Sequence, residues 1–125
     1  MECREFSGHL RHRIPEKLLR SYAARACRLY GAPILTVDVQ AERGYRASYN
    51  MLDFHIRLDP VQGCNLLTLA HEIAHHLTWV RSPRAHDHGP IWLRHYAHLV
   101  DTFRLMPAKA LLIAARKYNL TAASF

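Results

Sequence analysis

Apolar residues recur at intervals of three and four along four stretches of the chain, the spacing that places side chains on one face of a helix. This periodicity predicts helices over residues 15–30, 65–80, 90–103 and 107–118. Pro15 begins the first helix and Gly31 follows it, because proline suits a first helical turn and glycine suits a helix end. Asn65 can cap the second helix by accepting a backbone N–H.

Between the first two helices the pattern changes to alternation, which is typical of strands. We expect strands over residues 34–40, 45–49 and 54–58. In the last of these, apolar Phe54, Ile56 and Leu58 would face one side, and His55 and Arg57 the other. A helix, three short strands and then three helices predict a single α+β domain over residues 1–125, with a small, mainly antiparallel sheet.

The composition is typical of a globular protein. Half of the 125 residues are apolar, but no apolar run reaches the roughly 18–20 residues needed to cross a bilayer. The first 13 residues are polar and charged, unlike a signal peptide, so we expect a cytoplasmic protein without membrane contact. Three cysteines occur without any Cys-x-x-Cys pair, which excludes a zinc ribbon and a disulfide framework.

The chain is strongly basic, with a net charge of +7. Such a charge suits contact with nucleic acid or an acidic partner. The basic residues are dispersed along the sequence, although Arg13, Lys17, Arg20 and Arg28 could line one face of the first helix. A solvated helix face is the ordinary explanation of such a row.

The strongest chemical signal is a His-Glu-x-x-His motif in the second predicted helix, formed by His71, Glu72 and His75. Two histidines four residues apart project from one helix face, with Cβ atoms about 5–6 Å apart, and can bind one Zn²⁺ ion. Glu72 can reach a zinc-bound water as a general base. A third ligand from outside the helix would leave the fourth position open, as in catalytic zinc sites. The motif therefore indicates an enzyme.

Several residues could supply that third ligand. No glutamate follows Glu72 in the sequence, so a glutamate from a later helix is excluded. The candidates are His88, His86, Asp101 and the histidines of the third predicted helix, His95 and His98.

Other polar residues could support the site. Zinc-binding histidines are usually oriented through their second ring nitrogen, and Asp87 and Asp101 are candidates for this role. Tyr49 or Tyr96 could stabilise an oxyanion. His76 lies about a hundred degrees around the helix from His75, so we expect it to have a packing or surface role.

The motif and its surroundings resemble the SprT-like (Spartan-type) metallopeptidases over roughly residues 15–105. That family has a strand ending near a proline, a His-Glu-x-x-His helix, and then His-Gly-Pro followed two residues later by an aromatic residue. Here these features are residues 56–60, 71–75 and 88–90, with Trp92 as the aromatic residue. The resemblance implies a minimal zincin domain in which His71, His75 and His88 bind one Zn²⁺ and Glu72 is the catalyst. Many relatives also carry a zinc ribbon, which this chain lacks.

The expected function is that of a zinc-dependent metalloprotease, a hydrolase in which Glu72 moves the proton of a zinc-activated water to the leaving amine. The substrate would be a protein or peptide, including proteins associated with DNA. The strand over residues 54–58 would border the cleft, where substrate could add as a further strand. Two alternatives are a non-catalytic zinc-binding module for nucleic acid or protein partners, and a zinc hydrolase of a non-peptide substrate. The oligomeric state is not indicated.

Overall fold

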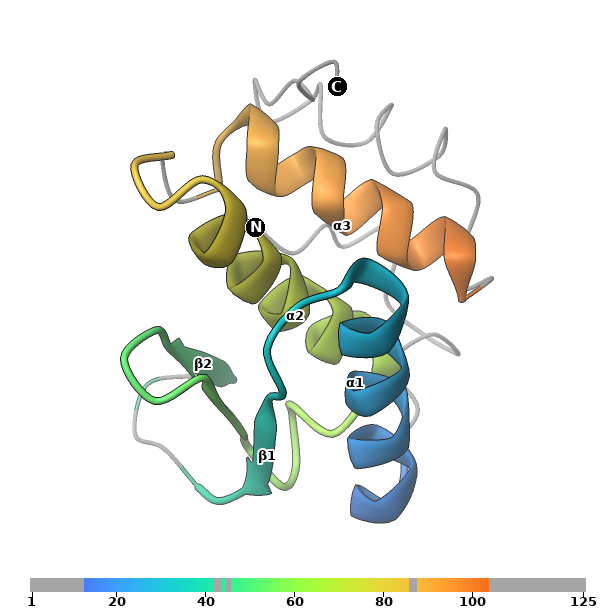
Figure 1. Ribbon diagram of the computed structural model, residues 1–125. Coiled ribbons are helices and arrows are strands. Elements are labelled where there is room, and N and C mark those ends of the chain that lie inside the picture. The colour runs from blue at the N-terminus through green and yellow to red at the C-terminus, as the bar shows by residue number, and fades with distance from the viewer. Residues whose placement is uncertain (1–12, 42–43, 45, 86–87, 104–125) are drawn as a thin grey trace, which may run out of the picture.

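The computed structural model describes residues 13–41, 44, 46–85 and 88–103 (Figure 1). Within these residues an α+β fold is formed by three helices and a three-stranded sheet, as the sequence predicts. The helices are α1 (Glu16–Tyr30), α2 (Leu66–Arg81) and α3 (Pro90–Thr102), and the strands are β1 (Thr36–Val39), β2 (Ala47–Asn50) and β3 (His55–Leu58). The predicted helix over residues 107–118 lies outside the described residues.

The sheet is mixed, whereas the sequence predicts a mainly antiparallel one. Its strand order is β1-β3-β2, with β3 parallel to β1 and antiparallel to β2. The turn over residues 51–54 folds β3 back beside β2, and this reversal gives β3 the direction of β1. Ile56 and Leu58 of the central strand are fully buried, and His55 and Arg57 alternate with them, as predicted.

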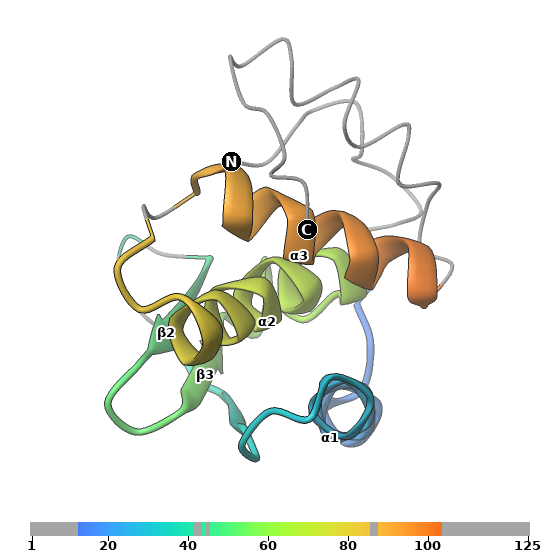
Figure 2. The same ribbon diagram turned by 45° about the horizontal axis from the view of Figure 1, so that its top comes forward.

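Helix α2 is the central element of the fold. It packs against α1, α3, β2 and β3, and Figure 2 shows it between the sheet and α3. The Asn65 side chain accepts the backbone N–H of Thr68 at 2.8 Å, which confirms the predicted cap. The helix ends at Arg81, just before Ser82-Pro83. Because α2 is enclosed on most sides, the histidines of its motif are held on a rigid support.

The other helix ends also follow the sequence signals. Gly31 adopts the left-handed conformation (φ 62°) after α1, and the next amide, of Ala32, donates to the Cys27 carbonyl at 2.9 Å. The first helix begins one residue later than predicted, at Glu16, because Pro15 is the cap residue before α1. Pro90 is the first residue of α3. None of the described helices is both long and apolar enough to span a membrane.

Gly63 allows three backbone segments to meet just before α2. A Cβ at this position would overlap the Arg46 carbonyl oxygen and lie 2.6 Å from the Asp59 nitrogen. The Gly63 amide donates to the Asp59 carbonyl, and the Asp59 amide donates to the Arg46 carbonyl, both at 2.9 Å. This close approach ties the start of α2 to the residues that flank β2 and β3.

The described cysteines are structural. Cys27 and Cys64 are both buried and neither forms a disulfide. Burial raises the pKa of both thiols, which keeps them protonated and unreactive at neutral pH.

Candidate metal centre

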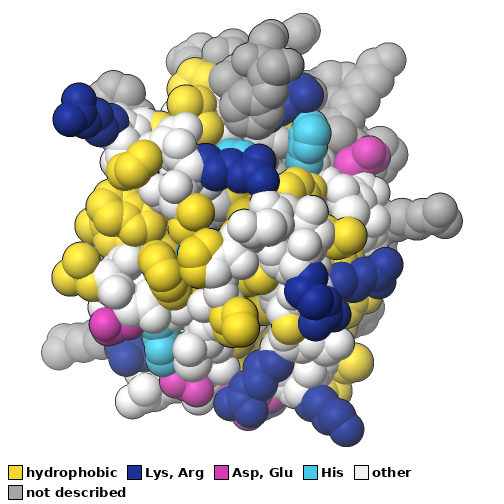
Figure 3. All heavy atoms as spheres, viewed as in Figure 1, with side chains coloured by type: hydrophobic (Ala, Val, Ile, Leu, Met, Phe, Trp, Pro, Cys, Tyr) yellow, Lys and Arg dark blue, Asp and Glu magenta, His cyan; other side chains and the backbone are white. Residues whose placement is uncertain are grey.

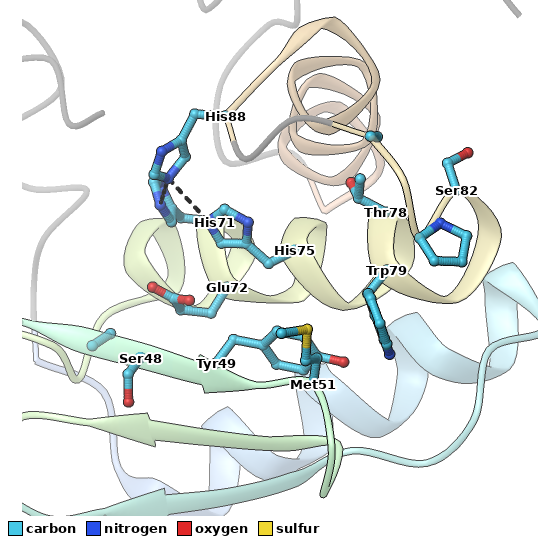
Figure 4. Close-up of a pocket in the computed structure, with 13 residues that line it drawn as sticks. Ser48, Tyr49, Met51, His71, Glu72, His75, Thr78, Trp79, Ser82 and His88 are labelled. Carbon is cyan, nitrogen blue, oxygen red and sulfur yellow. Dashed lines mark hydrogen bonds between the residues drawn. The ribbon is translucent and has the colours of Figure 1, made fainter.

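Three histidines from two parts of the chain converge beside α2. The Nε2 atom of His88 lies 3.1 Å from that of His71 and 3.0 Å from that of His75 (Figure 4). Among the described residues these three form the group able to hold a metal ion. The structure thus brings together the three ligands that the family resemblance implies.

The geometry suits a metal ion better than hydrogen bonding among the rings. A neutral imidazole carries one N–H, on either ring nitrogen, and a single proton on His88 Nε2 cannot point along both short N···N lines. A cation between the rings would bind all three nitrogen lone pairs at once. The three histidines could therefore hold one metal ion.

His88 reaches this position through an unusual backbone conformation. Its φ angle is +56°, in the left-handed region, which is uncommon for residues other than glycine, although histidine tolerates it better than most. Gly89 and Pro90 follow directly, as the cap and first residue of α3. Strained backbone of this kind concentrates at functional sites, and here it occurs at the one candidate ligand that does not lie on α2.

Trp92 packs against all three histidines. Its ring centroid lies 4.9 Å from that of His71, 5.4 Å from that of His75 and 4.7 Å from that of His88. The side chain is fully buried, and its Nε1–H donates to the His71 carbonyl at 3.3 Å. In the sequence Trp92 is only the aromatic residue of the family pattern, but in the structure it also limits how the three rings can move.

The cluster opens into a cleft of about 620 Å³. Its lining residues come from the β2 region, from α2 and from the segment after α2: Ala47, Ser48, Tyr49, Met51, His71, Glu72, His75, Thr78, Trp79, Ser82, Pro83, Ala85 and His88. The strand beside the cleft is β2, whereas the sequence predicts that residues 54–58 border it. That prediction is wrong because β3 is the central strand, and strand order depends on pairing across the sheet.

Glu72 lies in the same cleft as the cluster. Its side chain is only 7 % exposed and is the one carboxylate among the described lining residues. In Figure 4 it projects from α2 beside His71, toward β2. The motif therefore places a carboxylate next to three candidate metal ligands.

The neighbouring histidine, His76, belongs to a different environment. It is fully buried, with Nε2 2.8 Å from the Pro33 carbonyl oxygen and Nδ1 2.7 Å from the Tyr49 hydroxyl. A carbonyl can only accept, so Nε2 carries the proton, and Nδ1 accepts from Tyr49. Of the packing or surface role predicted for His76, the structure shows the packing role.

The hydrogen bond to His76 also bears on the protonation state and direction of the Tyr49 hydroxyl. Burial, with a smaller contribution from Cys27, raises the pKa of Tyr49 to about 12, and burial lowers the pKa of His76 despite its hydrogen bond to Pro33. Both groups are therefore neutral at pH 7. Since the Tyr49 hydroxyl proton is donated to His76, it is not directed at the cluster, and Tyr49 is not an oxyanion donor in this structure.

The remaining candidates do not join the cluster or lie outside the described residues. His98 and Asp101 are exposed on α3, and His95 is 4 % exposed, with its pKa lowered to about 4 by burial and then by the positive charge of Arg81. None of the three belongs to the metal-capable group among the described residues. His86 and Asp87 fall outside the described residues.

Some basic residues hold the fold together. Arg20 donates through Nε to the Val37 carbonyl at 3.0 Å and pairs with Glu16 at 3.1 Å, which joins α1 to β1. Arg81 donates to the Tyr30 carbonyl at the end of α1. Figure 3 shows basic side chains spread over this face, while hydrophobic ones gather at the left, over the β2–β3 turn and the end of α2. Part of the positive charge is therefore structural.

No protein-family model, curated protein or solved structure matches this chain. Its function is therefore inferred from the chemistry of the site.

Proposed function

We propose that this protein is a zinc-dependent metallopeptidase of the SprT-like type. The observation that carries the proposal is the convergence of three imidazole Nε2 atoms beside the carboxylate of Glu72, with that of His88 3.0–3.1 Å from the other two. Tetrahedral zinc with Zn–N bonds of about 2.0–2.1 Å requires N···N separations of about 3.3 Å, so small ring movements would complete the site. Three protein ligands leave a fourth position for chemistry.

A zinc ion bound by His71, His75 and His88 supplies Lewis-acid chemistry, lowering the pKa of water and polarising a carbonyl. The Glu72 carboxylate accepts a proton from the attacking water. It then returns that proton to the nitrogen of the amine that leaves as the peptide C–N bond breaks. Trp92 closes the cluster on its buried side, so substrate approaches from the cleft.

The surroundings of the cluster favour a peptide substrate. β2 lies at an edge of the sheet among the described strands and lines the cleft opposite α2. An extended peptide can add to such an edge through main-chain hydrogen bonds, which would carry its carbonyl groups past the cluster. This arrangement favours a peptidase over a zinc hydrolase of another substrate, and Glu72 in the cleft favours catalysis over a purely structural zinc site.

A nucleic acid partner would contact the protein outside the cleft. Among the described residues that line the cleft there is neither lysine nor arginine. The net charge of +7 would therefore act at other surfaces, where it could hold the enzyme near proteins associated with nucleic acid.

The experiment is a screen of unfolded protein substrates with the zinc-loaded protein, with and without a chelator, and with Glu72→Gln. We expect the chelator to abolish cleavage. Glu72→Gln should lower the cleavage rate by about 10²–10⁴-fold, the usual contribution of a general base, while zinc content stays the same. Asp101→Asn is the matched control, because Asp101 is an exposed carboxylate on α3 outside the cleft. Full activity in Glu72→Gln would refute the proposed mechanism.

A further inference from the structure

The cleft extends well beyond the histidine cluster along one face of α2. His71, His75, Thr78 and Trp79 of α2 line it together with Ser82, which follows the helix. The spacing of the four helix residues keeps them on neighbouring turns of one helix face. With a rise of about 1.5 Å per residue, Trp79 lies about 6 Å beyond His75 along the helix axis. Figure 4 shows Trp79, Met51 and Ser82 toward the C-terminal end of α2, away from Glu72.

This far part of the cleft is mainly apolar, with Thr78 and Ser82 as its polar residues. Met51, Trp79, Pro83 and Ala85 contribute most of its side chains. The hydroxyl of Thr78 donates to the Ala74 carbonyl at 2.7 Å, within its own helix. Glu72, at the other end, is the only acidic side chain among the described lining residues, and there is no lysine or arginine among them. Among the described residues of this far part, none would offer a charged substrate group an ion-pair partner.

Met51 exposes apolar surface at the edge of this region. It lies in the turn between β2 and β3 and is 47 % exposed, and the next residue, Leu52, is 82 % exposed. Met51 lines the cleft, but Leu52 does not. Methionine is flexible and adapts to differently shaped apolar partners. A bound side chain between Met51 and Trp79 would remove apolar surface from water on both walls.

We infer that the space between Trp79 and Met51, here named the distal subsite, selects substrates with a large apolar side chain near the bond to be cleaved. An extended chain advances about 3.3 Å per residue, so a side chain about 6 Å beyond His75 belongs to a residue about two positions from the scissile bond. This inference rests on the proposed peptidase function and adds its substrate class. The selected residues are leucine, methionine, phenylalanine and similar side chains.

The test is cleavage of a library of short peptides with randomised positions by the zinc-loaded protein. We expect cleavage to favour large apolar residues over serine, aspartate and lysine by about tenfold or more at one position. This is the selectivity that an apolar pocket usually provides. Met51→Glu should lower this preference about tenfold and raise cleavage next to lysine and arginine. Leu52→Glu is the matched control and should leave the preference unchanged. Equal preferences in the two variants, or none in the unmodified protein, would overturn the distal subsite.

A binding measurement separates this inference from the peptidase proposal. The Glu72→Gln protein is titrated with two labelled peptides that differ only by leucine or serine at one position, using fluorescence anisotropy. Tighter binding of the leucine peptide, lost in the double variant with Met51→Glu, supports the distal subsite even if the unmodified protein cleaves nothing. Metal-dependent cleavage with equal binding of both peptides would support the peptidase and refute the subsite.

Discussion

His75 and His76 are adjacent on α2 but lie in two chemically different regions. The His75 ring faces two other imidazoles, and its Nε2 lies 3.0 Å from another ring nitrogen. The His76 ring donates through Nε2–H to the Pro33 carbonyl and accepts at Nδ1 from the Tyr49 hydroxyl. The first region gathers three ring nitrogens that could bind one cation together, and the second satisfies every polar atom of the ring. Histidine-rich sequence alone therefore says little, and the partners of each ring nitrogen decide its role.

The two regions are also mechanically connected. Tyr49 of β2 lines the cleft, and its hydroxyl bonds to His76 on the adjoining face of α2. Phe54, in the turn before β3, packs edge-on against the same imidazole, with centroids 5.1 Å apart. The His76 region thus fixes β2 against α2, and this contact sets the width of the cleft that the cluster shares.

The largest predicted effect is the difference in zinc-dependent stability between a variant of His75 and a variant of His76. Metal binding to the folded state should stabilise the unmodified protein by about 4 kcal/mol when free zinc is a thousandfold above its dissociation constant. His75→Ala should lose this zinc-dependent gain, and His76→Gln should keep it. Thermal melting with zinc and with a chelator measures the difference. An equal zinc response in both variants would break the distinction between the two regions.

A second prediction concerns buried histidines outside the cluster. His95 has a pKa of about 4 in the folded protein, against about 6.5 in an unfolded chain. As the pH falls, the unfolded state therefore binds a proton at this group before the folded state does. The contribution of His95 to the free energy of unfolding is complete above pH 6.5 and falls by about 3 kcal/mol as the pH drops toward 4. The lowered pKa of His76 adds a slope of the same sign.

Denaturant unfolding of the metal-free protein between pH 7 and pH 4 measures this slope. His95→Gln should flatten it, while His98→Gln, at an exposed position on the same helix, should change it less. An unchanged slope in His95→Gln would show that His95 is not held neutral by the fold.

The smallest predicted effect tests the link between β2 and α2. Tyr49→Phe removes the hydroxyl that donates to His76 Nδ1 and leaves a buried acceptor unsatisfied, which should lower the free energy of unfolding by about 1–2 kcal/mol. Tyr22→Phe is the control, because the structure gives the Tyr22 hydroxyl no hydrogen bond among the described residues, and its cost should stay within about 0.5 kcal/mol. Equal costs in urea unfolding would mean that the Tyr49 hydroxyl contributes no stability.

The sequence predicts the local parts of this molecule well. Asn65 and the apolar repeat define α2, and the four-residue spacing of His71 and His75 is enough to place both on one face of that helix. Alternation in residues 54–58 correctly predicts which side chains of β3 are buried. These signals depend on interactions between residues close in sequence.

Contacts between distant residues are predicted less well. Alternation does not encode the neighbouring strand, so it specifies neither the central place of β3 nor the position of β2 beside the cleft. The contact of Trp92 with three imidazoles depends on how α3 crosses α2. The Tyr49–His76 hydrogen bond likewise requires a sheet packed on a helix. The family resemblance is the main reason to favour His88 as third ligand, and the structure brings it to the other two.

The most direct test of the central claim is the zinc content of purified protein, measured by elemental analysis after dialysis against metal-free buffer. We predict one zinc ion per chain in the unmodified protein and in His98→Ala, and almost none in His88→Ala. Unchanged zinc content in His88→Ala, or no zinc in the unmodified protein after loading, would contradict the three-histidine centre.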